Sequence, residues 1–74
     1  MAKNKKNGSR VYKRIDLVGL SSKGFEDAIQ NAVSKANETL QGLSWFEVKE
    51  LRGAISNGIV REYQAIVTVS FEVL

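Results

Sequence analysis

The sequence predicts a small α+β domain with the element order β-α-β-β, in which one helix covers one face of a three-stranded sheet. Apolar residues recur every three or four positions between residues 25 and 40, and apolar and polar residues alternate between 59 and 73. An Asn-Gly pair at residues 57 and 58 marks a tight turn just before the alternating segment. The 74 residues are enough for one such domain.

The first predicted strand covers Val11 to Val18. This segment is rich in β-branched and aromatic residues and alternates loosely. We expect Gly19 and the serines after it to end the strand.

The predicted helix covers Phe25 to Leu40. Acidic residues in its first turn meet the positive end of the helix dipole, and Gly24 or Ser22 is the expected N-cap. Gly42 is placed to end the helix in a left-handed conformation. One apolar stripe on a 3.6-residue period is formed by Phe25, Ala28, Ile29, Ala32, Val33, Ala36 and Leu40.

Two further strands are predicted at Leu43 to Ile55 and at Ile59 to Val73. They pair antiparallel through a hairpin at Ser56-Asn57-Gly58, because Asn and Gly tolerate positive φ.

The alternation of the third strand assigns the two faces of the sheet. The face toward the helix holds Tyr63, Ala65, Val67, Val69, Phe71 and Val73, and the other face holds Glu62, Gln64, Ile66, Thr68, Ser70 and Glu72. In the second strand we expect Phe46 and Val48 in the core. The opposite face then receives Trp45, Glu47, Lys49 and Leu51, although a β-bulge near Glu50 to Arg52 would change this phase beyond the bulge.

Trp45 is therefore expected on the face that the helix does not cover, with Ile66, Leu51 and Gln64. Burying one tryptophan side chain contributes about 2–3 kcal/mol, a large share of what a small core supplies. Its cover could be another subunit, or a flat ligand that stacks on the indole while Gln64 hydrogen-bonds the ligand's polar edge. The residues alone leave both open.

Composition narrows the classes of function. Cysteine and histidine are absent, which removes disulfides, common zinc ligands and two of the commonest catalytic groups. We therefore expect no enzyme and no metal site, and self-association is the leading way to stabilise so small a core. The glutamates on the strands, Glu47, Glu50, Glu62 and Glu72, are expected to be solvated or to form salt bridges rather than to do acid/base work. A hard cation held between subunits by these glutamates is the minor alternative. At the start of the helix a bound anion is likewise the minor alternative, and we favour ordinary capping.

The net charge of +3 is unevenly spread, since six basic residues precede residue 15 and all eight acids follow it. Residues 1–10 form a basic leader that we expect to stay disordered. It has no apolar run, so we expect neither export nor a membrane span, and a cytoplasmic location is the default. The leader could contact nucleic acid weakly, but a solubilising tail is favoured.

From residue 11 to 74 the sequence resembles the dodecins, a small flavin-binding family. The resemblance rests on Val11-Tyr12-Lys13, Val18-Gly19, Phe25-Glu26-Asp27-Ala28, Leu43-Ser44-Trp45-Phe46-Glu47-Val48, Glu50-Leu51-Arg52-Gly53 and Glu62-Tyr63-Gln64. It implies a β-α-β-β subunit with an antiparallel sheet wrapped around its helix, and a hollow homododecamer that binds paired flavins between subunits.

By the same resemblance, Trp45 stacks on the isoalloxazine of FMN or riboflavin, and Gln64 hydrogen-bonds its polar edge. The implied role is storage, buffering and photoprotection of flavin, with fast electron transfer from tryptophan quenching the excited state. Arg52 is a further candidate for a contact in the pocket or between subunits, and an equal alternative is a structural salt bridge with a glutamate. Gly24 and Thr68 depart from the family, where a serine and often a basic residue stand. If that base contacts a phosphate, the preference for FMN is open here, as is binding of coenzyme A.

Two alternatives come from other classes of protein. One is an oligomeric structural or interaction protein without a small ligand. The other is a nucleic-acid binder that uses the basic leader, which the acidic remainder of the chain argues against.

Overall fold

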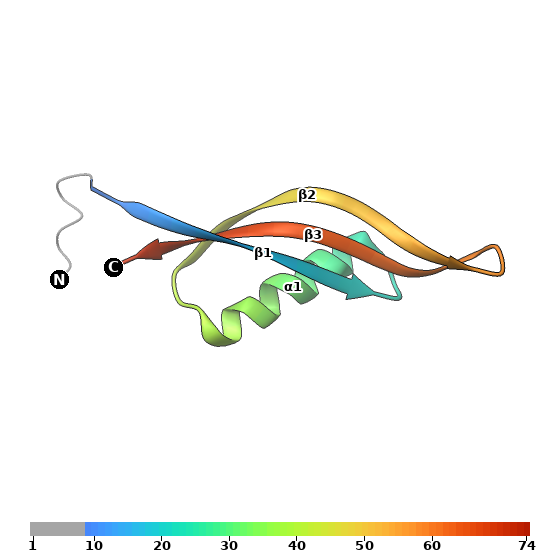
Figure 1. Ribbon diagram of the computed structural model, residues 1–74. Helices are drawn as coiled ribbons and strands as arrows, with labels where there is room; N and C mark the ends of the chain where they lie inside the picture. Colours follow the sequence, from blue (N-terminus) through green and yellow to red (C-terminus); the bar gives the residue numbers. More distant parts are fainter. Residues whose placement is uncertain (1–8) are drawn as a thin grey trace.

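The computed structural model describes residues 9–74, so residues 1–8 of the predicted leader lie outside the described part. The element order β-α-β-β is confirmed, and the strands form one antiparallel sheet in the order β1-β3-β2 (Figure 1). The longest strand is therefore the central one. The elements are β1 (Val11–Ser21), α1 (Phe25–Thr39), β2 (Leu43–Ser56) and β3 (Ile59–Val73).

Strand β1 is longer than predicted, because it continues through Gly19 to Ser21. Gly19 does not end the strand; it lets the helix approach it. A Cβ added there would lie 2.0 Å from the carbonyl oxygen of Ala28 and 3.0 Å from the Cβ of Ala32. Only glycine permits this close contact between β1 and α1.

The start of α1 confirms Gly24 as the N-cap, and no side chain forms a capping hydrogen bond there. Ser21 Oγ accepts hydrogen bonds from the backbone N–H groups of Lys23 (2.8 Å) and Gly24 (3.4 Å), and it donates to Asp27 Oδ2 at 2.7 Å. Ser21 thus ties the loop before α1 to Asp27 in the first turn of the helix. At the other end the C-cap is Leu40 in an extended conformation, so Gly42 does not end the helix as expected, although its φ of 77° is positive.

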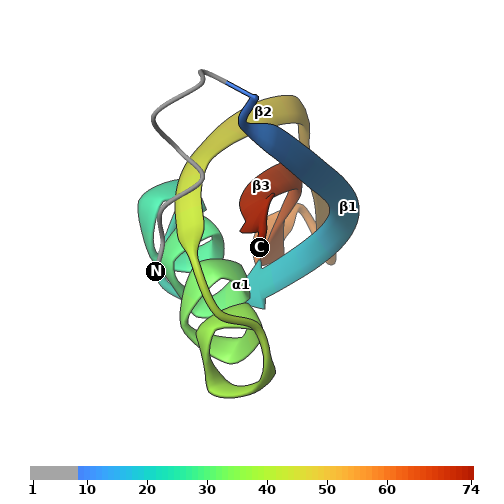
Figure 2. The ribbon, with the colours of Figure 1, turned by 90° about the vertical axis from the view of Figure 1, so that its left-hand side faces the viewer.

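The core lies between α1 and the strands β1 and β3, and α1 packs chiefly against these two strands. The predicted faces of β3 are confirmed, since its buried apolar side chains face the helix. The central cluster consists of Ala28, Ala32, Ala65, Val67 and Val69, flanked by Ile15, Leu17, Ile29, Val33 and Leu43. Seen end-on, β1 and β2 curve away on either side of β3, with α1 on one side of the sheet (Figure 2).

Strand β2 lies beyond the cover of the helix, which corrects one prediction. Phe46 and Val48 pair with Val69 and Val67 and so occupy the expected face. They are not core residues, however, because they remain 48% and 43% exposed. Because α1 packs chiefly against β1 and β3, these two side chains of the edge strand β2 are only partly covered within one subunit.

The hairpin and the bulge also set which residues share a face. Asn57 and Gly58 both have positive φ and form the predicted two-residue turn. The register shifts at Lys49, just before the stretch where a bulge was expected. Leu51 consequently pairs with Ala65 on the helix side, so its assignment to the opposite face was wrong.

Candidate ligand-binding surface

The outer face of the sheet, defined here as the face opposite α1, carries Trp45 as predicted. Trp45 pairs with Ser70 of β3, and its side chain stays 46% exposed. The two residues share a face because directly opposed residues in an antiparallel pair point the same way. An indole this exposed has room for a further stacking partner.

Tyr12 of β1 covers part of this indole, a contact that the sequence did not suggest. The ring centroids of Tyr12 and Trp45 are 4.8 Å apart with an interplanar angle of 54°. The Arg10 guanidinium carbon lies 5.7 Å from the centre of the Tyr12 ring, within cation–π range. Trp45 is thus braced by a tyrosine of its own subunit.

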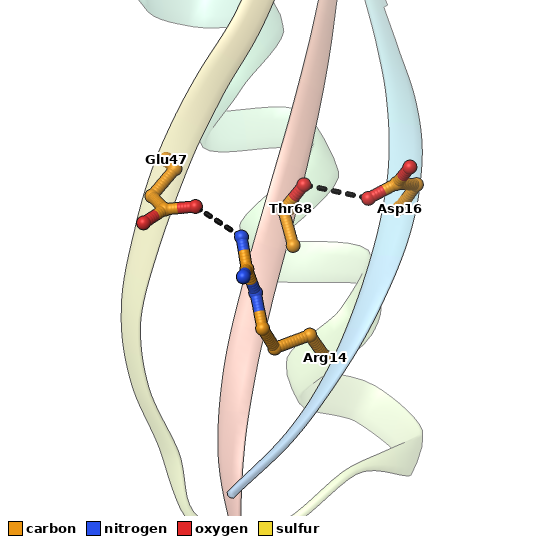
Figure 3. A network of polar contacts seen from close by, with 4 residues as sticks. All are labelled: Arg14, Asp16, Glu47 and Thr68. Carbon is orange, nitrogen blue, oxygen red and sulfur yellow. Dashed lines mark hydrogen bonds and ion pairs between the residues drawn. The ribbon is translucent and has the colours of Figure 1, made fainter.

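Polar side chains from all three strands surround the base of this aromatic pair. Arg14 of β1 crosses β3 and forms an ion pair with Glu47 of β2, while Thr68 donates a hydrogen bond of 2.6 Å to Asp16 (Figure 3). The strong curvature of the sheet brings side chains of its two edge strands, β1 and β2, into contact across β3. Thr68 is only 3% exposed as a result.

Ser70 lies on the same face, paired with Arg14 on one side and Trp45 on the other. It is 1% exposed, and its hydroxyl oxygen has no hydrogen-bond partner among the described residues. Although they lie on the outer face, Thr68 and Ser70 are therefore both buried, next to Trp45 and Tyr12.

Gln64 and Arg52 contact each other further along the outer face. Arg52 Nε donates to Gln64 Oε1 at 2.7 Å, and Gln64 Nε2 donates to Glu62 Oε1 at 2.9 Å. Arg52 Nη1 also lies 3.8 Å from Glu50 Oε2. The salt bridge considered for Arg52 is present, and it coexists with a direct contact to the other candidate residue.

Trp45 and Gln64 are far apart within one subunit. Trp45 pairs with Ser70, which stands six positions from Gln64 along β3. At about 3.3 Å per residue, the two side chains start roughly 20 Å apart. Within one subunit these two candidate residues therefore do not form one compact site.

Of the glutamates on the strands, Glu47 forms an ion pair with Arg14 and Glu50 forms one with Arg52, while Glu62 accepts a hydrogen bond from Gln64. Within residues 9–74 there is no group of three or more residues that could hold a metal ion. In the same part of the chain no helix is long and apolar enough to cross a membrane.

Comparison with known proteins gives a consistent result. A family model described as Dodecin matches residues 11–74. A curated dodecin from Thermus thermophilus is 52% identical over 62 residues, covering 84% of this chain and 90% of that protein. A crystal structure from Thermus thermophilus matches with a TM-score of 0.86 and 48% identity, covering 89% of this chain and 97% of the other.

A dodecin structure from Streptomyces coelicolor matches with a TM-score of 0.87 at 36% identity, covering 89% of this chain and 94% of the other. Fold, family model and relatives agree across the same segment that carries Trp45, Arg52 and Gln64. The chain therefore belongs to the dodecin family.

Proposed function

We propose that this protein binds flavin in pairs between the subunits of a hollow homododecamer, and that it stores, buffers and photoprotects flavin without turning it over. The ligand is FMN or riboflavin, and the location is cytoplasmic. Trp45 stacks on the isoalloxazine ring, while Gln64, with Arg52 beside it, comes from a neighbouring copy. When bound, the flavin supplies an excited state that electron transfer from the indole quenches.

The half-exposed Trp45 carries this proposal. Its indole is held by Tyr12 on the outer face, and a flat aromatic ligand fits its remaining surface. Gln64 offers a donor and an acceptor suited to the polar edge of such a ligand. The separation of about 20 Å between these two side chains in one copy favours a site built by two copies.

The uncovered stripe on β2 supports self-association independently. Phe46 and Val48 lie on the helix side of β2, where α1 does not cover them. Since apolar patches of this kind are typical of protein interfaces, a second copy is their expected cover. A homo-oligomer then explains both the stability of a 74-residue chain and the divided ligand site.

The surroundings of Thr68 bear on which flavin is preferred. Its hydroxyl is buried and already donates to the Asp16 carboxylate. A carboxylate at this place repels a phosphate, so we expect FMN to gain little over riboflavin from contacts around Thr68.

The test is a titration of FMN and of riboflavin with the purified protein, followed by flavin fluorescence. Binding should quench the emission, and Trp45→Ala should weaken binding by about 5- to 150-fold, since a stacked aromatic contributes roughly 1–3 kcal/mol. Trp45→Phe keeps a smaller aromatic ring, so its affinity for flavin should lie between those of the wild type and of Trp45→Ala.

Light scattering on each variant controls for assembly. Undiminished quenching by an assembled Trp45→Ala variant would refute the assigned stacking residue. A wild-type dodecamer that binds no flavin at micromolar concentration would instead favour the structural or interaction protein. A further titration with coenzyme A decides whether that ligand also binds.

A further inference from the structure

The side-chain amide of Gln64 is held in one orientation by two neighbours of opposite character. Arg52 Nε, which can only donate, lies 2.7 Å from one amide atom, and that atom must be the oxygen. Glu62 Oε1, an acceptor, lies 2.9 Å from the other amide atom, which must be the nitrogen. Turning the amide over would oppose two donors at one end and two acceptors at the other.

This orientation leaves a defined set of free groups. A glutamine amide has two N–H donors and an oxygen with two lone pairs. One donor is used by Glu62 and one lone pair by Arg52, so one N–H and one lone pair remain for a ligand. Gln64 is half-buried, whereas the Arg52 side chain is half-exposed and further fixed by Glu50.

We propose that Arg52 and Glu62 are positioning residues that hold the Gln64 amide in this single orientation. The amide thereby presents its free lone pair and N–H in one fixed order, so a ligand placed by stacking must bring its N–H donor, such as the flavin N3–H, to the oxygen end and its carbonyl to the nitrogen end. This inference rests on the proposed function and adds the determinant of its specificity. Arg52 then acts through Gln64 and need not touch the ligand.

The experiment compares two uncharged probes, lumiflavin and 3-methyllumiflavin, which differ in the N3–H donor and carry no phosphate. Both are titrated by flavin fluorescence with the assembled protein. The wild type should bind lumiflavin about 2- to 10-fold more tightly, the worth of one net hydrogen bond. In Arg52→Met the amide can turn over, and the ratio should fall toward one.

Arg52→Lys keeps a cationic donor and should restore much of the preference for lumiflavin. Glu62→Ala frees the nitrogen end and should also lower the ratio. Arg61→Met is the matched control, because it removes the same charge from an exposed residue of β3 whose parity places it on the helix side. It should leave the ratio unchanged.

The readout is the ratio of two affinities, which a general loss of assembly or packing would not move. If Arg52→Met weakens both probes equally and the ratio holds, the positioning role is wrong, although flavin binding stands. A wild type that quenches both probes without preferring lumiflavin overturns it as well. If Arg52→Met fails to assemble, Glu62→Ala decides by the same ratio, and a wild type that quenches neither probe refutes the proposed function itself.

Discussion

Adding one methyl group at Gly19 should separate the helix from the sheet. In Gly19→Ala the new Cβ would lie 2.0 Å from the carbonyl oxygen of Ala28, and Cβ atoms essentially never come within 3.0 Å of such an atom. The helix or the strand must therefore move by at least 1.0 Å at this point. The obstacle is backbone, so no change of rotamer relieves it.

The expected cost follows from the packing that this movement disturbs. Ala28 and Ala32 lie in the central core cluster, and a gap of about 0.5–1 Å already forfeits a quarter to a half of a dispersion contact. Overpacking of this kind costs about 1–3 kcal/mol. For a domain of this size each kcal/mol corresponds to about 4–8 °C in Tm, so a loss of several degrees to roughly 20 °C is expected.

The assay is thermal unfolding followed by circular dichroism, with all variants at one protein concentration because association shifts Tm. Gly24→Ser is the matched control, since a Cβ there meets nothing within 4 Å and its φ of 167° is extended backbone. It should be neutral or stabilising by a few tenths of a kcal/mol through better capping. Equal stability of the two variants would refute the steric argument.

Three further substitutions test the outer face. Tyr12→Leu should weaken flavin binding about 2- to 10-fold, because it removes an aromatic contact to Trp45 worth about 0.5–1.5 kcal/mol, and Tyr12→Phe should retain it; fluorescence titration measures both. Thr68→Val keeps the shape of the side chain but loses the hydrogen bond to Asp16. Urea unfolding should show a loss of about 0.5–1.5 kcal/mol in the free energy of unfolding. An unchanged free energy would mean that water replaces the hydrogen bond without cost. Ser70→Ala should be neutral or stabilising by up to about 1 kcal/mol in the same assay, since the buried hydroxyl has no partner among the described residues; a clear loss would reveal a partner.

The secondary structure could be predicted from the sequence because each element has a strong local signal. The 3.6-residue stripe, the alternation of β3 and the turn at Asn57-Gly58 are all local, and all three elements are present. The end of β1 was missed because glycine is usually read as a breaker. At Gly19 its purpose is the contact with Ala28, which lies nine positions away and depends on tertiary packing.

The arrangement of the candidate site could be predicted from the sequence only in part. The extra residue at Lys49 changes which residues of β2 share a face, and it moved Leu51 to the helix side while placing Arg52 beside Gln64. No residue type marks such a bulge uniquely. The contact of Tyr12 with Trp45 spans the whole sheet and arises from its curvature, which alternation along single strands does not encode.

The uncovered side of β2 has a consequence for the newly synthesised chain. Until another copy arrives, Phe46 and Val48 face water on a strand that also presents an unpaired edge. Association with a second copy then competes with non-specific association with other exposed apolar surfaces. With a second copy as the proposed cover, dilution leaves Phe46 and Val48 facing water for longer and so favours aggregation.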